Sequence, residues 1–555
     1  MSGTVRVTQY PARAAAWRVS FHPDWIAAIV VAAGFLWRLW LAHATFFNSD
    51  EAWHYSLANQ RSLYLAYKAS LTIPHPPLLV FVLYFWRSLG TSNLVLRLPC
   101  VIAGTLFCWI FWKWLTALVG KAAGWAGLIL ATFLPPMVAF AADLRQYPLM
   151  LLFMVSAAYL LERSLAQNSA SRTILSMVCL YLAILSSYSA FFFAAVLGVY
   201  GILRILAKPP SGKVIAAWGI GQAAGLGLAW FLYVSHIARI GSLQVPWLYD
   251  YYFHPGSARL LPFLYHATFG VFRFVFGQIT VGGAATLMFV AGVLLLLFQK
   301  PASEATPPSR LTGILLLLPF VLNGAAVLAG LYPYGRTRQC VFLAVFALAG
   351  VSVLLAKIAR QKAGLAAALA IVMVVLCHVF GTLQGRDMLP LAEQRHQHMD
   401  RAIEFIHREV QAEDVIFVDA ATRLQLAHYL CRQEQVDIDR SVNGFESFQC
   451  DGFRVISTGP NEGVLTADTF ANRWQEMVRS FSRKPGTNVW VFQGGWASGL
   501  GKALRDRSPE FSEIQPQSFG RYLEIFKLKV GPLPERIASG PPLNEAQSRA
   551  YPQPS

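Results

Sequence analysis

Long runs of apolar residues recur through the first 383 residues, and they restrict the fold more than any other feature of this sequence. Several runs reach the ~18 to 20 residues that a helix needs to cross a bilayer. Hydrophobic residues make up 55% of the chain and charged residues 14%, with a mean hydropathy of +0.45. A soluble protein carries about a quarter charged residues. The sequence therefore predicts a polytopic α-helical membrane protein.

We expect about 11 transmembrane helices, each a run of apolar residues between polar connections. The expected spans are Trp25–Phe46, Leu94–Leu118, Ala122–Ala142, Tyr147–Leu161, Ile174–Ser187, Ala190–Leu206, Val214–Val234, Ile279–Phe298, Leu311–Leu331, Cys340–Ala356 and Gly364–Leu383. Residues Asp50–Ser70 predict an amphipathic interfacial helix. Residues Pro76–Gly90 are apolar but too short to span easily, so we expect a second interfacial or re-entrant helix.

The charges predict the orientation of the spans. The chain has 46 basic and 29 acidic residues. Of these, 26 basic and 7 acidic residues lie before Gln384, and 20 basic and 22 acidic residues lie from Gln384 onward. The positive charge lies in short loops between apolar runs, as the positive-inside rule expects for cytoplasmic loops. No basic stripe with interleaved aromatic residues occurs, so nucleic-acid binding is set aside. With the N-terminus inside, the soluble C-terminal part is exported.

Four regions follow from this organisation: a cytoplasmic leader at 1–24, a membrane domain at 25–383, an extracytoplasmic α/β domain at 384–535 and a disordered tail at 536–555. Amphipathic helical spacing in Met399–Val410 and β-type runs such as Asp414–Asp419 support the α/β assignment. Cys431 and Cys450 lie in this domain. They form a disulfide if it is extracytoplasmic, and two unlinked thiols are the alternative.

Carboxylates are scarce in the membrane half, and four of the seven fall on the outer face in this topology. These four are Asp50, Glu51, Asp143 and Asp250. An ionisable group beside the bilayer is costly and is a functional hypothesis by default. Each one taken singly is equally explained as an interfacial solvated residue. For Asp50 converging with Asp143 we favour function, with Asp50 as a general base that takes a proton from an acceptor group.

The same outer loops carry candidate partners for an anion. Arg145 and Tyr147 lie in "ADLRQYP", and Arg336 and Arg338 lie in "YPYGRTRQ". Arginine pairs bidentately with phosphate, so these four residues are the candidate phosphate site. The competing interpretation is that the arginines extend towards lipid headgroups.

Four motifs occur in order along the first third of the chain. They are "SDEAWHY" (Ser49–Tyr55), "IPHPPLL" (Ile73–Leu79), "LGTSNLVLRLP" (Leu89–Pro99) and "AADLRQYPL" (Ala141–Leu149). Together they resemble the GT-C superfamily of integral-membrane glycosyltransferases, in its bacterial branch of protein O-mannosyltransferase-like (family 39) and aminoarabinose-transferase-like enzymes. The likeness in order and spacing extends over Trp25–Leu161.

The resemblance implies a glycosyltransferase of the bacterial inner membrane. It implies a polyprenyl-phosphate-linked sugar donor and an acceptor in the cell envelope, which is a glycan, a lipid or a protein. Asp50 aligns with the catalytic base, Glu51 is its neighbour, and Asp143 aligns with the second acidic residue. Some members hold a divalent cation, for which His75 and either His254 or His236 are the candidates here. A lone histidine near an interface is more often a hydrogen-bonded structural residue, and we favour that interpretation over a metal ligand.

Two other functions are compatible with a polytopic chain. A transporter or flippase for lipid-linked sugars often shows inverted repeats and midplane sites, whereas this sequence shows no internal repeat and places its carboxylates at one face. A non-catalytic membrane subunit displaying the exported domain leaves those carboxylates unexplained. The sugar, the acceptor and the lipid chain length are not encoded in any motif.

Overall fold

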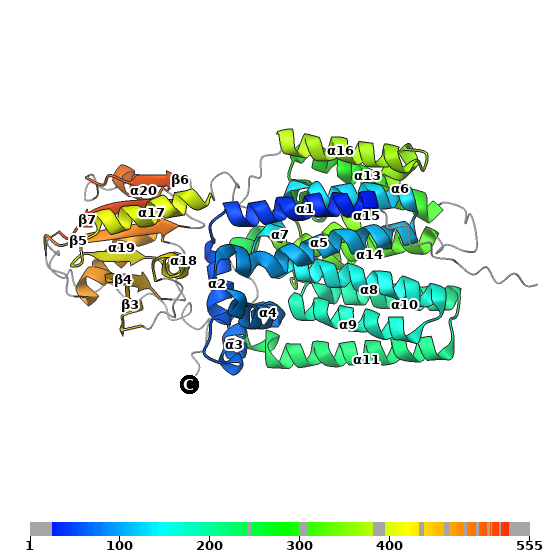
Figure 1. Cartoon of the computed structure of the whole chain (residues 1–555), viewed down its shortest axis with the longest axis horizontal. Helices are drawn as coiled ribbons and strands as arrows, with labels where there is room; N and C mark the ends of the chain where they lie inside the picture. The colour runs from blue at the N-terminus through cyan, green and yellow to red at the C-terminus, as the bar shows by residue number, and fades with distance from the viewer. Residues whose placement is uncertain are drawn as a thin grey trace, which may run out of the picture.

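The computed structural model describes residues 25–240, 246–298, 309–380, 395–431, 438–459, 465–481, 485–494, 499–507, 511, 513–520 and 523–531. The predicted leader, the predicted domain border at 383/384 and the predicted tail lie outside the described residues. The described chain forms a bundle of long helices and a smaller sheet domain at one end of that bundle (Figure 1).

The long helices of the bundle confirm a multi-pass membrane protein. They are α1 (Trp25–Ala44), α5 (Asn93–Leu118), α8 (Tyr147–Gln167), α9 (Ala170–Ser186), α10 (Ala190–Ala207), α11 (Gly212–Ser235), α12 (Leu260–Phe276), α13 (Ile279–Phe298), α14 (Ser309–Leu328), α15 (Ala344–Ile358) and α16 (Ala363–Phe380). Among the described residues, nine helical segments are long and apolar enough to span, or ten if one bent pair counts as one span. Helix α9, the other expected span, has 17 residues.

The bent pair is α6 (Lys121–Phe133) and α7 (Pro135–Ala142), whose axes differ by 56°. The span expected at Ala122–Ala142 therefore consists of two helices joined at a bend. Pro135 and Pro136 lack the N–H groups that would continue the helical ladder, and the residue before a proline is pushed out of the helical region. Leu134 is accordingly extended, with φ −62° and ψ 130°.

Three short helices lie at the end of the bundle that faces the sheet domain (Figure 1). They are α2 (Ser49–Ala58), α3 (Leu63–Ser70) and α4 (Leu78–Trp86). The expected single helix at Asp50–Ser70 is wrong, because the chain breaks between Ala58 and Leu63. Ser62 accepts a hydrogen bond from the N–H of Leu65 and starts a new helix there. Helix α4 confirms the short apolar helix expected within Pro76–Gly90.

The C-terminal domain has a seven-stranded sheet in the order β2-β3-β4-β1-β5-β7-β6. The strands are β1 (Val415–Val418), β2 (Arg440–Val442), β3 (Phe445–Cys450), β4 (Phe453–Thr458), β5 (Asn488–Gly494), β6 (Gln517–Gly520) and β7 (Leu523–Lys529). Strands β4, β1 and β5 are parallel, and the other pairs are antiparallel. The α/β composition predicted for this domain is confirmed.

Helices cover both faces of the sheet, and the alternation along β1 shows how. Ile416 and Val418 pack with α17 (His396–Glu409) and α18 (Ala420–Leu430). Val415 and Phe417 pack on the other face with α19 (Ala467–Ser480) and α20 (Leu500–Arg507). Successive side chains of a strand point to opposite faces, so both apolar sets are buried.

A disulfide joins Cys431, directly after α18, to Cys450 at the end of β3, with their Cα atoms 4.8 Å apart. This settles the alternative that the sequence left open. The bond attaches the C-terminal end of α18 to the sheet.

Candidate active site

The helix that carries the first two carboxylates begins with a reciprocal cap. The side chain of Asn48 accepts the N–H of Glu51, and the carboxylate of Glu51 accepts the N–H of Asn48, both at 3.0 Å. This capping box satisfies two amides that a helix N-terminus leaves without partners. The cap fixes where α2 starts, and it places Asp50 in the first turn, where the helix dipole favours a negative charge.

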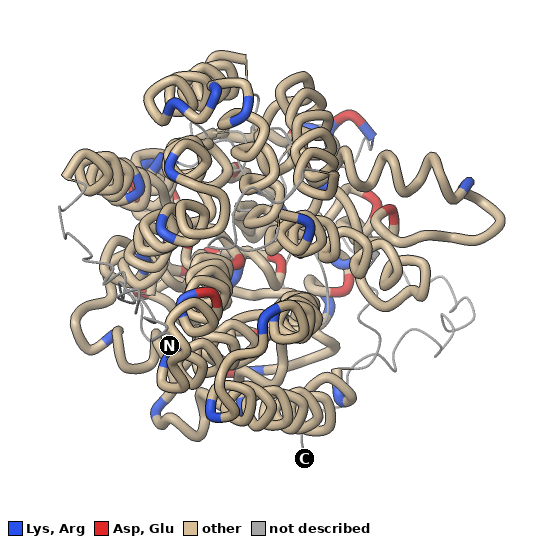
Figure 2. Tube along the Cα trace, turned by 90° about the vertical axis from the view of Figure 1, so that its right-hand side faces the viewer, with Lys and Arg blue, Asp and Glu red and all other residues tan. Residues whose placement is uncertain are grey.

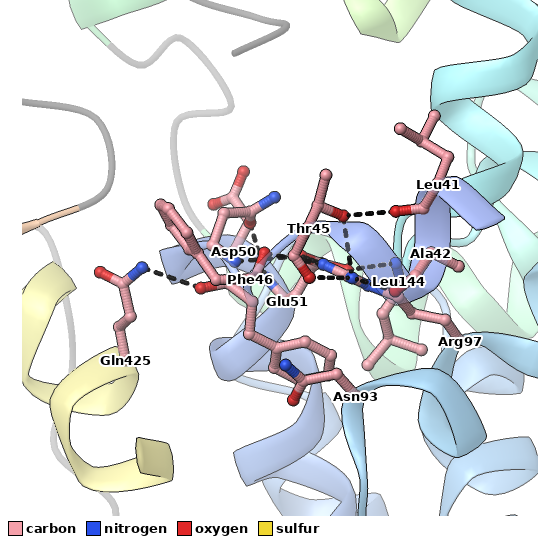
Figure 3. A network of polar contacts seen from close by, with 12 residues as sticks. Leu41, Ala42, Thr45, Phe46, Asp50, Glu51, Asn93, Arg97, Leu144 and Gln425 are labelled. Carbon is pink, nitrogen blue, oxygen red and sulfur yellow. Dashed lines mark hydrogen bonds and ion pairs between the residues drawn. The ribbon is translucent and has the colours of Figure 1, made fainter. Parts of the chain in front are cut away.

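Glu51 is fully buried and forms a network that joins three segments (Figure 3). Arg97 of α5 donates from Nε to Oε1 at 2.7 Å and from Nη2 to Oε2 at 2.6 Å. The N–H of Leu144 donates to Oε1 at 2.7 Å. With the Asn48 N–H, this makes four donors, about the number that a carboxylate can accept. Glu51 therefore holds α2, α5 and the turn at 143–145 in fixed relation.

Arg97 is equally well satisfied. Its remaining N–H groups donate to the backbone carbonyl of Ala42 in the last turn of α1 and to those of Thr45 and Phe46, in the segment that joins α1 to α2, at 2.7 to 2.9 Å. A buried ion pair is tolerated when further hydrogen bonds satisfy both partners, and removing one partner leaves a buried charge uncompensated. The Glu51–Arg97 pair is built in this way.

Asp50 lies between two guanidinium groups from distant loops. Its Oδ2 accepts Nη1 of Arg145 at 2.8 Å and Nη1 of Arg338 at 2.6 Å. Burial by itself would raise the pKa of Asp50, but Arg145 and Arg338 outweigh it and hold the pKa well below its ordinary range. Asp50 is therefore a carboxylate whose charge is neutralised by two arginines.

Asp143 has the opposite electrostatic environment. It follows α7 directly, and its N–H bonds to the carbonyl of Ala139. Burial raises the pKa of Asp143 to about 7, the nearby Glu51 carboxylate adds to the rise, and Arg97 and Arg145 oppose it. Two carboxyl groups in one cluster thus have pKa values displaced in opposite directions, a pattern typical of acid–base sites.

The structure brings together most of the residues that the sequence singled out. Asp50, Glu51, Asp143, Arg145 and Arg338 form one cluster, in which Arg338 and Asp50 are 288 positions apart. Sequence order alone does not place these five side chains together, so the convergence is a finding of the structure.

Tyr147 and Arg336 lie at the edge of this cluster. The guanidinium of Arg145 stands 5.8 Å from the ring centroid of Tyr147, whose buried hydroxyl has no hydrogen-bond partner among the described residues. The backbone of Arg336 packs on α12, where a Cβ added at Gly270 would lie 3.0 Å from its nitrogen. The two ion pairs to Asp50 described above come from Arg145 and Arg338.

The histidines predicted as metal ligands have other neighbours. The ring of His75 stacks on His54 with centroids 5.8 Å apart, and His54 Nδ1 donates to the carbonyl of Asp50. His254 stacks on Tyr249 and donates to its carbonyl, whereas His236 bonds to the hydroxyl of Tyr188. Within the described residues, no three His, Cys, Asp or Glu side chains are close enough to hold a metal ion.

Burial dominates the titration of the two stacked rings. It lowers the pKa of His54 to about 4, and Arg145 contributes in the same direction. It also lowers the pKa of His75 well below its ordinary value. Both rings are therefore neutral near pH 7, and they add no positive charge beside Asp50.

Residues of the C-terminal domain complete the site, and sequence reasoning missed them. The hydroxyl of Tyr429 accepts the N–H of Phe47 at 2.6 Å and the side-chain amide of Asn93 at 2.8 Å. Gln425 donates to the carbonyl of Phe47 at 2.8 Å, and His428 stacks on the Phe47 ring with centroids 4.5 Å apart. Helix α18 thus contacts both the backbone and the ring of Phe47, in the turn that leads into α2.

Arg97 was missed as a site residue, although the sequence contains a signal for it. A charged residue at the start of a spanning helix requires a partner, and Glu51 is one of few carboxylates available. The contacts of α18 carry no such signal, because they join backbone groups and neutral side chains more than 330 positions apart.

The comparisons with known proteins agree with this architecture. Residues 74–233 match the family model described as dolichyl-phosphate-mannose-protein mannosyltransferase. The structure of ArnT from Cupriavidus metallidurans bound to undecaprenyl phosphate aligns over 91% of this chain and 98% of that chain, with 12% identity and a TM-score of 0.51. No curated protein gives a significant sequence match.

Two further solved structures align less closely. The oligosaccharyltransferase AglB from Archaeoglobus fulgidus, in complex with an inhibitory peptide and a dolichol-phosphate, covers 85% of this chain and 70% of that chain, with 12% identity and a TM-score of 0.46. The arabinosyltransferase EmbB from Mycobacterium smegmatis covers 69% and 42%, with 14% identity and a TM-score of 0.33. The chain is therefore a multi-pass membrane protein with a GT-C-like fold similar to that of ArnT, and its residues 74–233 match the dolichyl-phosphate-mannose-protein mannosyltransferase family model.

Proposed function

We propose that this protein transfers a sugar from a polyprenyl-phosphate-linked donor to an acceptor of the bacterial cell envelope, with Asp50 as the general base. The observation that carries the proposal is the placement of Asp50 between Arg145 and Arg338 in a GT-C fold. A carboxylate for the acceptor proton and two guanidinium groups for a phosphate are the two parts that such a transfer requires.

The donor phosphate would compete with Asp50 for the two arginines. Arginine binds phosphate through paired N–H groups, and a phosphodiester offers more acceptor oxygens than the single Oδ2 that now receives both. Once the phosphate takes the guanidinium groups, the charges that depress the pKa of Asp50 are neutralised and its burial dominates. Donor binding would thereby make Asp50 a stronger base.

The transfer step then balances. Asp50 takes a proton from the acceptor hydroxyl or amine, and the acceptor forms a bond to the anomeric carbon. The bond between that carbon and the phosphate oxygen breaks, and the polyprenyl phosphate leaves with the electron pair. Arg145 and Arg338 stabilise the charge that develops on the leaving phosphate. Asp143 orients the acceptor, and Glu51, saturated by four donors, organises the site.

The basic residues support the predicted orientation in the inner membrane. Figure 2 views the bundle from the end remote from the sheet domain, and Lys and Arg predominate at the helix ends there. By the positive-inside rule this is the cytoplasmic end, so the Asp50 cluster and the C-terminal domain are extracytoplasmic. The Cys431–Cys450 disulfide supports the same assignment, because such bonds persist in oxidising compartments.

The test uses the purified full-length chain with an isolated prenyl-phosphate sugar and an envelope fraction as acceptor. Asp50→Asn is expected to abolish transfer without changing folding. Asp250→Asn, an exposed acidic residue outside the cluster, is the matched control and should transfer normally. Normal transfer by Asp50→Asn would remove the assignment of the base. Movement of the lipid-linked sugar across a vesicle membrane, without transfer, would favour the flippase.

A further inference from the structure

A buried arginine in the first spanning helix has no carboxylate among its described partners. Arg38 lies in α1 with 1% of its surface exposed. Its guanidinium donates to the backbone carbonyls of Gly34, Thr132 and Ala131 and to the thiol of Cys108, at 3.0 to 3.4 Å. A charge inside a spanning segment is costly and is usually paired. Arg38 instead donates to backbone carbonyls, and the positions of two of these carbonyls explain why a cation is needed there.

The two carbonyls of α6 that bind Arg38 are those whose helical partners are missing. In a continuous helix, Ala131 O and Thr132 O would accept the N–H groups of residues 135 and 136. Both of those residues are proline and have no N–H. Nη2 of Arg38 donates to Ala131 O and Nη1 to Thr132 O, each at 3.0 Å. The partial negative charge at the C-terminal end of α6 also favours a cation.

The next carbonyl is capped from another helix. Phe133 O accepts Nε2 of His378 in α16 at 2.9 Å. Trp37, the neighbour of Arg38, stacks on His378 with ring centroids 4.9 Å apart and lies 6.0 Å from the Phe133 ring. The break between α6 and α7 is thus capped by side chains of α1 and α16 on three successive carbonyls, and the thiol of Cys108 in α5 donates to Ala131 O as well, at 3.4 Å.

One glycine makes room for the guanidinium, and a second allows α5 to approach α7 closely. A Cβ at Gly34 would stand 2.3 Å from Cγ2 of Thr132 and 2.9 Å from Nη1 of Arg38. A Cβ at Gly104 of α5 would stand 2.4 Å from Cβ of Ala141 in α7. The backbone of α1 therefore packs against the side chain of Thr132 at the break, and the backbone of α5 packs against the side chain of Ala141 in α7.

The bend determines where the 143–145 turn lies. Helix α7 has eight residues, about 12 Å, and ends at Ala142, directly before Asp143. If α6 continued straight, a 56° change in direction would move the end of α7 by about 10 Å. That displacement would break the bond from the Leu144 N–H to Glu51 and separate Arg145 from Asp50.

We propose that Arg38 is a positioning residue for the Asp143–Arg145 turn, because it supplies the two hydrogen bonds that Pro135 and Pro136 cannot and so holds the bend that places this turn beside α2. The effect on transfer rests on the proposed function, whereas the capping of the break does not. The tests below separate the two.

The first test measures the unfolding midpoint of the full-length protein in detergent. Arg38→Met should lower it by several degrees. In a Pro135→Ala/Pro136→Ala background, where both N–H groups are restored, the same change should cost less than half as much. Equal losses in the two backgrounds would overturn the capping of these carbonyls by Arg38.

The second test asks whether the effect reaches the turn. Hydrogen–deuterium exchange of peptides covering 136–147 should rise in Arg38→Met. Arg204→Met is the matched control, because it removes another partly buried arginine. Arg204 is paired with Glu162 at 3.1 Å, and Glu162 lies about 20 Å along α8 from Tyr147. That variant should lose stability without changed exchange in 136–147. Unchanged exchange in Arg38→Met would contradict the positioning role.

The third test measures transfer below the unfolding midpoint of each variant. The transfer rate of Arg38→Met should be at least tenfold below that of the wild type. Arg38→Lys keeps one donor group, so its rate should lie between the two. The rate of Arg204→Met should stay within twofold of the wild type. Transfer by folded Arg38→Met within twofold of the wild type, or a loss matched by Arg204→Met, would overturn the positioning role. A wild-type protein that transfers no sugar would refute the proposed function alone, and the exchange measurement would then decide on Arg38.

Discussion

The hydroxyl of Tyr429 in the C-terminal domain accepts the backbone N–H of Phe47, three positions before Asp50, at 2.6 Å. The same oxygen accepts the side-chain amide of Asn93 at the start of α5. One phenol from the sheet domain therefore fixes both the turn before α2 and the helix that contributes Arg97. The sheet domain is a structural part of the site and not an appendage to it.

Tyr429→Phe should reduce transfer while the chain remains folded. It leaves two donors without their acceptor, at a cost of about 1 to 3 kcal/mol for each buried donor left unsatisfied. We expect a lower unfolding midpoint and a several-fold loss of transfer. Tyr64→Phe is the control, because the Tyr64 ring is exposed and the substitution keeps its stacking with Lys68. Wild-type transfer by Tyr429→Phe would show that the α18 contact does not support the site.

Arg97→Met should destabilise the protein more than most surface substitutions, by about 3 to 5 kcal/mol, because it leaves Glu51 charged and buried without its partner. The change is measured as a loss of folded protein on size-exclusion chromatography and as a lower unfolding midpoint. Glu51→Gln should show a related, smaller loss of stability. A Glu51→Gln protein as stable as the wild type but devoid of transfer would instead assign a direct chemical role to Glu51.

The raised pKa of Asp143 gives transfer a pH dependence. If the ionised carboxylate orients the acceptor, kcat/KM for the acceptor should rise as the pH increases through about 7. In the donor-free protein the pKa of Asp50 is held below its ordinary range, so any limb that Asp50 contributes to this profile belongs to the donor-bound protein. Asp143→Asn should flatten the profile. A limb near pH 7 that persists in Asp143→Asn would belong to another group.

The same pKa makes a prediction about stability. Because the folded-state pKa of Asp143 is raised, its contribution to stability is fully present below the unfolded value of 3.8 and is lost as the pH rises through about 7. Asp143→Asn should therefore unfold at a higher temperature than the wild type at pH 8, and the difference should vanish near pH 4. A difference that is independent of pH would show that the burial of this carboxyl is not the cause.

Reduction of the Cys431–Cys450 disulfide should weaken both the sheet domain and the site. Closing a loop with a sequence separation of 19 contributes about 3 kcal/mol in the chain-entropy account. We expect a lower unfolding midpoint and reduced transfer in the Cys431→Ala/Cys450→Ala variant. Cys179→Ala, a free cysteine in α9, is the control. Unchanged transfer with a lower midpoint would separate the stability of the sheet domain from its role at the site.

Much of the site was predictable because scarcity is a strong signal in an apolar chain. Asp50 and Asp143 were identified because the first 383 residues hold only seven carboxylates. Arg145 and Arg338 were identified because they lie on the same outer loops, and the structure brings both to Asp50. The local errors have physical causes that the hydropathy pattern does not record. Apolar periodicity continues through Leu134–Pro136 and hides the bend, and Asn59–Ser62 interrupts what had been expected as a single interfacial helix.

The missed contributions share another cause. The partners of Arg38 are backbone carbonyls that any sequence possesses, and they are defined only once the helices pack. The contacts of Gln425 and Tyr429 with Phe47 are likewise to backbone atoms. No pattern of residue types specifies such contacts, because they follow from tertiary structure alone.

The contacts of α18 with Phe47 also have a consequence for biosynthesis. The polypeptide emerges from the ribosome N-terminus first, so the segment before α2 exists long before Gln425 and Tyr429 are synthesised. A nascent or truncated chain that ends before α18 contains the carboxylates and arginines of the site but lacks the hydrogen bonds from α18 to Phe47. We therefore expect the segment before α2 to gain these contacts only after α18 has been translated.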